Sequence, residues 1–272
     1  MIAPRGILSA LLIAGGLITA ALSPAPTGAD VGDAQLRTAR SPVIAIDPGH
    51  GGPEVGAVSP EGDLAEKDVN LRIALRLATL LKADGYQVVL TRDSDRAVDT
   101  RYVGAGYPTV RYDLQARVDI ANEAGALLFL SLHNNGGPAS EAGTEVWYSQ
   151  ERAFGDRNRV LAESVQAGIV GSLRTIGYNP RDRGIKDDST FRIFRGQAYN
   201  IYVLGPGTGP RSHVPTAMPG VLGESLFLSN PTDAAMLRQP ATLDAIARGY
   251  RTGVRTYLAA FPIPAASDSA PH

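Results

Sequence analysis

The sequence predicts a single α/β domain with a mostly parallel or mixed central sheet flanked by helices. Short apolar runs alternate along the chain with longer amphipathic stretches, which is the pattern of α/β proteins. The length of 272 residues suits one domain of this class. Hydrophobic residues make up 44% and charged residues 19% of the chain, a composition typical of folded proteins.

Strands are predicted at short, continuous apolar runs, because a strand covered on both faces has no polar side. These runs are residues 43–46, 87–90 and 127–132, with weaker candidates at 144–148 and 220–226. Helices are predicted over residues 65–84, 113–124, 155–174 and 240–260. Gly85 stands where a glycine commonly ends a helix, just before the second strand.

Two long segments, 97–112 and 176–219, match neither pattern and are rich in Gly, Pro and charged residues. Loops of this length inside a compact domain are usually functional or mobile. We interpret both as rims of a cleft. A surface insertion is the alternative, and the sequence leaves it open.

Residues 1–29 are predicted to be a secretory signal peptide. One basic residue, Arg5, precedes a nearly continuous apolar run, and small residues follow. The alternative is a membrane anchor, but the run is shorter than the roughly 20 residues that a membrane span needs. Residues 30–42 are then interpreted as a linker, 43–261 as the folded domain and 262–272 as a disordered tail.

The charge balance excludes some classes of partner. Lys and Arg number 26 and Asp and Glu 27, and removing residues 1–29 would take away Arg5 and no acid, leaving a net charge of −2. This balance gives no electrostatic reason to expect binding to nucleic acid or to an anionic membrane surface. The chain contains no Cys, which excludes disulfides and a lipoprotein anchor, so the fold must rely on its core and any bound metal.

Two histidines follow predicted strands. His50 lies in a glycine-rich turn after the first strand, and His133 lies at the end of the most apolar strand. Ligands bind at the carboxyl ends of strands in open α/β sheets, and neutral imidazole is the commonest metal ligand. An exposed turn is the alternative for His50; a phosphate loop would need a Gly-Lys-Ser/Thr ending that is missing.

Glu66 shares the apolar side of its predicted helix. Apolar residues recur at helical spacing after it, which places its carboxylate toward the core. Such a group costs several kcal/mol unless it is paired or binds a metal. The alternative is a capping box, with Asp63 as N-cap and Glu66 as its partner, and helical spacing alone does not decide. Asn70, one turn on, is placed to support the carboxylate through a hydrogen bond.

Glu224 is a single carboxylate within the apolar run 221–228. Unpaired buried Glu is rare, so this residue is a functional candidate by itself. The alternative is an edge strand with Glu224 facing solvent.

With these residues and the motifs around them, the chain resembles the zinc-dependent N-acetylmuramoyl-L-alanine amidases of the Amidase_3 family, from about residue 43 to 258. The family's motifs occur in the family's order: IAIDPGHGG at 44–52, EKDVNLRIALRLATLL at 66–81, VVLTRDSD at 88–95, QARVDIAN at 115–122, SLHNN at 131–135, GTEVWY at 143–148, RGIK at 183–186 and GESLFLSN at 223–230. The ordered set is far more specific than any one motif.

The resemblance implies that His50, Glu66 and His133 bind one Zn²⁺ and that Glu224 is the catalytic carboxylate. It also favours the metal-binding interpretation of Glu66 over the capping box. His213 is the rival ligand, but it lies outside every matched motif.

The chain departs from the family's pattern in two places. The family usually has Gly where Leu226 stands, and the segment 97–112 is longer than expected. These departures affect the expected shape of the cleft more than its chemistry.

The resemblance further implies hydrolysis of the amide between N-acetylmuramic acid and L-alanine by zinc-activated water. The substrate would be peptidoglycan or a muropeptide, and we expect an exported monomer with no membrane span after signal cleavage. Asn135, Arg183 and Lys186 are further candidates for contact with substrate or ligands, with surface charge the alternative for the last two. A non-catalytic wall-binding relative and a zinc peptidase acting within the stem peptide are the rival functions.

Overall fold

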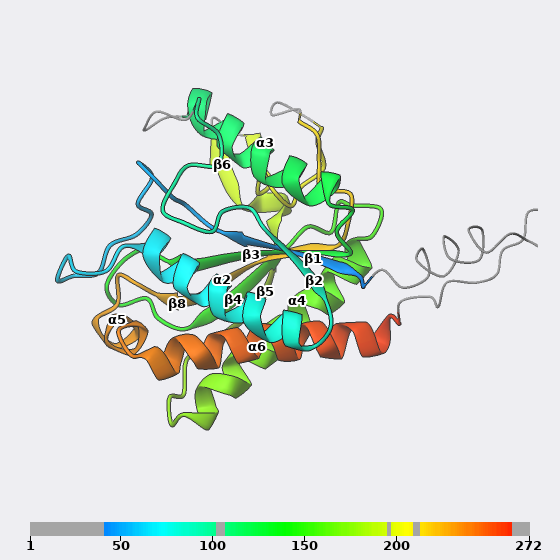
Figure 1. The fold of residues 1–272 in the computed structure, drawn as a ribbon. Coiled ribbons are helices and arrows are strands. Elements are labelled where there is room, and N and C mark those ends of the chain that lie inside the picture. The colour runs from blue at the N-terminus through cyan, green and yellow to red at the C-terminus, as the bar shows by residue number, and fades with distance from the viewer. Residues whose placement is uncertain (1–40, 102–106, 195–196, 209–212, 263–272) are drawn as a thin grey trace, which may run out of the picture. The chain divides into compact units, whose positions relative to one another are not determined.

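The computed structural model describes residues 41–101, 107–194, 197–208 and 213–262 (Figure 1). The predicted signal peptide lies outside the described residues, as do nearly all of the predicted linker and tail. Among the described helices, none is long and apolar enough to cross a membrane.

The core of the fold is a six-stranded mixed sheet in the order β2-β1-β3-β8-β4-β5. Its strands are β2 (Gln87–Leu90), β1 (Val43–Pro48), β3 (Leu128–Asn135), β8 (Gly220–Phe227), β4 (Thr144–Tyr148) and β5 (Asp182–Asp187). All neighbours pair in parallel except β4 and β8, which are antiparallel. The predicted α/β fold with a mostly parallel or mixed sheet is therefore confirmed.

Helices cover both faces of the sheet (Figure 1). One face packs against α2 (Glu66–Ala83), α4 (Gly155–Thr175), α5 (Pro231–Leu237) and α6 (Pro240–Ala260), and the other against α3 (Tyr107–Glu123). Alternate residues of a strand serve the two cores: Ile44 and Ile46 belong to the first, and Ala45 belongs to the second. Because both faces of the inner strands β1 and β3 are buried, these strands have no polar side, and this explains their continuous apolar runs.

The structure corrects the prediction in the two long segments. Helix α3 begins at Tyr107, so the first connection is shorter than predicted. The second contains β5, a short 3-10 helix η1 (Asp188–Thr190) and a separate antiparallel ribbon of β6 (Arg192–Phe194) and β7 (Gln197–Tyr199). β5 reads DRGIKD and lies at the sheet edge, so it carries no apolar run that could reveal it.

Strand register brings the candidate residues to one edge of the sheet. Pro48 of β1 is level with Leu132 of β3, and the next residue of β3, His133, is level with Glu224 of β8. Because β1, β3 and β8 are mutually parallel, the turn after β1 and the C-terminal halves of β3 and β8 lie toward this edge. It is the edge at which open α/β sheets bind ligands.

Candidate metal centre and its cleft

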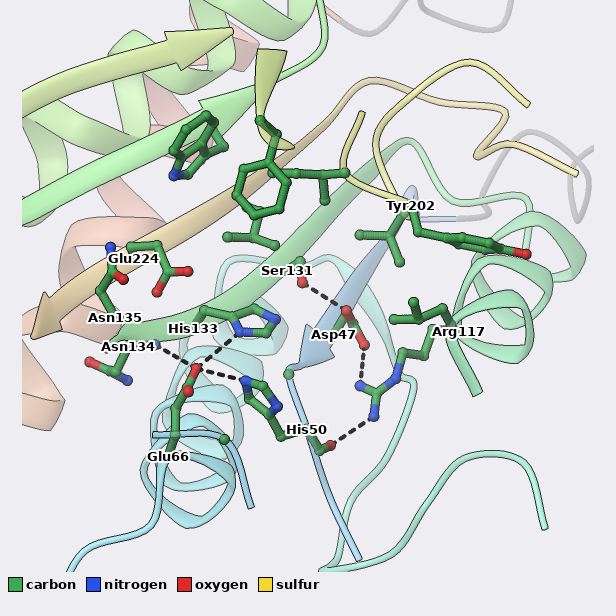
Figure 2. Close-up of a pocket in the computed structure, with 18 of the residues that line it drawn as sticks. Asp47, His50, Glu66, Arg117, Ser131, His133, Asn134, Asn135, Tyr202 and Glu224 are labelled. Atoms are coloured by element: carbon green, nitrogen blue, oxygen red, sulfur yellow. Dashed lines mark hydrogen bonds and ion pairs between the residues drawn. The ribbon is translucent and has the colours of Figure 1, made fainter. Parts of the chain in front are cut away.

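Three predicted ligands come together at the carboxyl edge of the sheet (Figure 2). His50, Glu66 and His133 each offer one ligand atom, and these atoms lie within 4.8 Å of one another. His50 Nε2 and His133 Nδ1 each lie 3.0 Å from the same oxygen, Glu66 Oε1. The side chains therefore converge on one point although they come from a turn, a helix and a strand.

Glu66 is the first residue of α2, and the capping-box alternative is wrong. The N-cap is Ala65, which makes no side-chain capping bond. Asp63 instead accepts a hydrogen bond from Ser59 Oγ at 2.8 Å and pairs with Arg238. Glu66 is therefore not a capping partner of the helix, and the Glu66 carboxylate can face His50 and His133.

The Glu66 carboxylate is buried, with 4% of the residue exposed, as its helical position predicts. It accepts the backbone N–H of Ala57 at 2.8 Å and of Asn134 at 3.1 Å, and the Nδ2 of Asn70 lies 3.3 Å from Oε1. Burial acts to raise the pKa of Glu66, but the hydrogen bonds with the two imidazoles outweigh burial and hold this pKa well below its usual range. The group is thus kept as an anion, the form in which it binds a metal.

His50 adopts a backbone conformation that histidine usually avoids. Its φ is 62°, and among the described residues no other non-glycine residue has positive φ. The left-handed conformation costs roughly 1–2 kcal/mol for a residue with a Cβ. Here it accompanies the approach of the imidazole to Glu66.

Glu54, which the sequence analysis missed, contacts the other nitrogen of His50. Its Oε2 lies 2.5 Å from His50 Nδ1. Burial acts to lower the pKa of His50, but hydrogen bonds with Glu54 and Glu66 raise it to about 10. A carboxylate bound to the far nitrogen of a histidine orients the ring for a metal. The available signal was an acidic residue four positions after His50 in the same turn.

His133 packs directly on the backbone of Gly49. A Cβ placed on Gly49 would lie 2.1 Å from His133 Nε2, which is closer than any real contact allows. Glycine at this position therefore permits the approach of the turn to the ring.

Glu224 lies beside the cluster on β8, level with His133. Its Oε2 is buried and has no hydrogen-bond partner among the described residues. Burial raises the pKa of Glu224 well above its usual range, and the charge of Glu66 adds to this effect. A buried carboxylate oxygen without a partner beside a ligand cluster is typical of a reactive group.

The other predicted site residues, Asn135, Arg183 and Lys186, all contact the carboxylate of Glu145. The sequence analysis missed Glu145. Its Oε1 accepts from Asn135 Nδ2 and Trp147 Nε1, each at 3.1 Å. Its Oε2 pairs with Arg183 Nε at 2.6 Å and Lys186 Nζ at 3.1 Å. Arg183 and Lys186 are therefore both ion-paired with the buried Glu145, and they are not isolated charges on the surface. The available signal was a lone Glu in an apolar strand, as for Glu224.

A pocket of about 720 Å³ joins these groups. His50, Glu66, His133 and Glu224 line it together with apolar side chains from α3 and from residues 191–203, which include Val110, Leu114, Phe191, Tyr202 and Val203. Both long segments thus contribute to a cleft, as predicted.

The rival ligand and the unusual leucine both lie outside this arrangement. His213 stacks on Tyr202, with ring centroids 4.0 Å apart, and is not part of the ligand cluster. Leu226 is buried in the core and does not line the pocket.

The donor set fits zinc. Two imidazoles and one carboxylate are the ligands of many catalytic zinc sites, which keep a further position open. The two imidazoles are each 18% exposed, toward the pocket that they line, so a substrate could reach an ion held there. The unpartnered oxygen of Glu224 in the same pocket supplies a place for a proton.

Comparison with known proteins identifies the family. The family model Amidase_3, described as N-acetylmuramoyl-L-alanine amidase, matches residues 44–256. The N-acetylmuramoyl-L-alanine amidase LytC of Bacillus subtilis (strain 168) is 34% identical over 215 residues, which are 79% of this chain and 35% of LytC. The germination-specific N-acetylmuramoyl-L-alanine amidase of the same strain is 31% identical over 216 residues, 79% of each protein.

A solved structure agrees with these matches. The N-acetylmuramoyl-L-alanine amidase from Clostridium difficile 630 superposes with a TM-score of 0.62 at 29% identity, over 81% of this chain and 98% of that one. The match to the family model extends over most of the chain and includes the four candidate residues His50, Glu66, His133 and Glu224. The chain therefore belongs to the Amidase_3 family of N-acetylmuramoyl-L-alanine amidases.

Proposed function

We propose that the chain is a zinc-dependent amidase of peptidoglycan or muropeptides. It cleaves the amide between the lactyl group of N-acetylmuramic acid and the L-alanine of the stem peptide. Membership of the family indicates which amide bond is cleaved. One observation on the structure supports a zinc-dependent hydrolysis of that bond. His50, Glu66 and His133 converge in a pocket that also contains the unpartnered oxygen of Glu224.

One Zn²⁺ per chain would be held by His50, Glu66 and His133. Bound there, zinc would supply a Lewis acid that polarises the amide carbonyl and lowers the pKa of water. Glu54 holds the Nδ1 side of His50, which leaves Nε2 directed to Glu66. Asn70 and two backbone N–H groups hold the Glu66 carboxylate, so the ligands are organised before a metal arrives.

Glu224 is the proton carrier of the proposed reaction. Its unpartnered Oε2 takes a proton from the attacking water and returns it to the amine of L-alanine as the C–N bond breaks. Burial raises the pKa of Glu224, whereas a nearby dication acts in the opposite direction. A carboxylate under such opposed effects can both accept and release a proton.

The reaction takes place outside the cytoplasm in this proposal. The substrate lies in the cell wall, and residues 1–29 have the pattern of a signal peptide. The mature chain would act there as a monomer in the periplasm, the wall or the medium.

Two substitutions test the assignment of roles. Glu224→Gln should keep one zinc per chain while activity falls about 10²–10⁴-fold, since general acid–base catalysis contributes an effect of this size. His133→Ala should lose the metal as well as activity. Elemental analysis and muropeptide turnover measure the two properties separately. Near-normal turnover by Glu224→Gln, or full zinc content in His133→Ala, would contradict the corresponding role.

A further inference from the structure

Two buried arginines lie behind the turn that presents His50. Arg92 follows β2 and Arg117 belongs to α3, and they are 0% and 2% exposed. Both stand in motifs of the sequence, VVLTRDSD and QARVDIAN, to which the proposed reaction gives no role. Neither side chain is among the metal-binding candidates.

Their guanidinium groups donate to three successive backbone carbonyls of the turn. Arg117 Nη1 donates to Pro48 O and Nη2 to His50 O, each at 2.7 Å. Arg92 Nε donates to Pro48 O and Nη2 to Gly49 O, each at 2.9 Å. Every carbonyl from residue 48 to residue 50 is therefore bound by an arginine, as Figure 2 shows for His50 and Arg117.

These hydrogen bonds stabilise the unusual backbone conformation of the turn. His50 holds a left-handed φ of 62°, which a residue with a Cβ keeps only where its surroundings impose it. Carbonyls directed inward would be costly without donors. With donors on all three, the peptide planes on both sides of His50 are fixed. A relaxation of φ would turn its ring away from Glu66.

Arg117 is itself held in place by charge. Its Nη1 lies 2.8 Å from Asp47 Oδ1 and its Nε 2.8 Å from Asp113 Oδ2. Asp47 also accepts from Thr91 Oγ1 at 2.6 Å and from Ser131 Oγ at 2.8 Å. The guanidinium is thus bound to Asp47 of β1, and Asp47 is in turn bound to β3 and to the residue that follows β2.

We propose that Arg117 and Arg92 are positioning residues for the metal centre. They hold His50 in its left-handed conformation and thereby set the affinity for zinc, without contact to the metal. This inference rests on the proposed zinc-dependent function. It predicts a loss of metal affinity when the arginines are replaced, even by residues of the same charge.

Arg117→Lys and Arg92→Lys test the inference in the full chain. Lysine keeps the positive charge, but its single nitrogen does not reproduce the fork that binds two carbonyls. The dissociation constant for zinc, measured by competition with a chromogenic chelator, should rise about 10–100-fold, the usual effect of losing a group that orients a ligand. The visible spectrum of the cobalt(II)-loaded protein should change as well, because it reports ligand geometry.

Arg251→Lys is the matched control. Arg251 pairs with Asp84 just beyond the C-terminal end of α2, away from the turn, and its replacement should leave zinc affinity and the cobalt spectrum unchanged. Melting temperatures of the metal-free variants separate a general loss of stability from a local effect. If both lysine variants at 92 and 117 bind zinc as the wild type does, or lose only stability, the inference is overturned.

The two proposals fail in different ways. If Arg117→Lys does not fold, Arg92→Lys decides the inference, because Arg92 donates to carbonyls and its replacement leaves no carboxylate without its partner. A wild-type chain that binds no zinc would overturn the proposed function together with the inference. Where Arg117→Lys does not fold, a wild type that binds zinc, with Arg92→Lys equal to it, would overturn the inference alone.

Discussion

At the scale of single residues, the candidate metal site depends on the close approach of the turn after β1 to the side chain of His133 on β3. His133 occupies the space that a side chain at position 49 would need. We therefore predict that Gly49→Ala displaces the His133 ring and sharply weakens zinc binding. Zinc content after dialysis, measured by elemental analysis, checks this outcome.

Gly171→Ala is the control for that substitution. A Cβ on Gly171, in the C-terminal half of α4, would meet no neighbouring group within 4 Å, and alanine stabilises a helix by roughly 0.5–1 kcal/mol relative to glycine. This variant should bind zinc normally and melt slightly higher. Full zinc content in both variants would show that the contact with His133 does not control the metal site.

Most of the candidate site residues could be predicted from the sequence, but some could not. His50, Glu66, His133 and Glu224 were predicted from position and resemblance, and the structure gathers them in one pocket. Glu145 was missed because helical or strand spacing does not show which lone carboxylate in an apolar strand faces a cleft. The capping-box alternative for Glu66 was a local pattern that tertiary contacts overrode.

At the scale of elements, a buried acid supports Asn200 and Ile201, two residues that line the cleft. Asp188 in η1 is 0% exposed, accepts from Ile201 N at 2.9 Å and from Asn200 Nδ2 at 3.0 Å, and so ties the residues after β7 to η1. Burial raises the pKa of Asp188 to about 6, above its ordinary value of 3.8. Ionisation of Asp188 is therefore less favourable in the folded state than in the unfolded chain.

We predict that this acid destabilises the fold as the pH rises. A raised pKa in the folded state means that stability is lost between about pH 4 and pH 6, by up to about 3 kcal/mol for a two-unit shift. Relative to the wild type, Asp188→Asn should thus gain stability on going from pH 4 to pH 7. Urea unfolding of both proteins at each pH measures this difference. A difference that stays constant with pH would contradict the assigned pKa.

The elements divide into those that the sequence reveals and those that it does not. Strands β1 and β3 are buried on both faces and β2 is partly buried, and the apolar runs of all three mark them in the sequence. β5 is a polar edge strand, and α5 is a seven-residue helix begun by Asn230, whose side chain accepts from two backbone N–H groups. Such elements form because neighbours and caps stabilise them, and periodicity does not detect them.

At the scale of the whole molecule, family and fold agree over the described domain. The chain matches 79% of its length to LytC but only 35% of LytC itself, so the comparison concerns the domain that the two share. Within it, the carboxyl edge of parallel strands gathers the proposed ligands from a turn, a helix and a strand that are far apart in sequence. The absence of Cys means that core packing and the proposed metal, with no disulfide, stabilise this arrangement.

The most direct test of the central claim is mass spectrometry of peptidoglycan digested by the purified chain, with and without a chelator. We expect new free amino termini on L-alanine and glycan freed of its stems. This activity should be lost with the chelator and restored by zinc. Shortened stems still attached to muramic acid would contradict the assigned bond and indicate a peptidase. Undiminished cleavage after the metal is removed would contradict the proposed role of zinc.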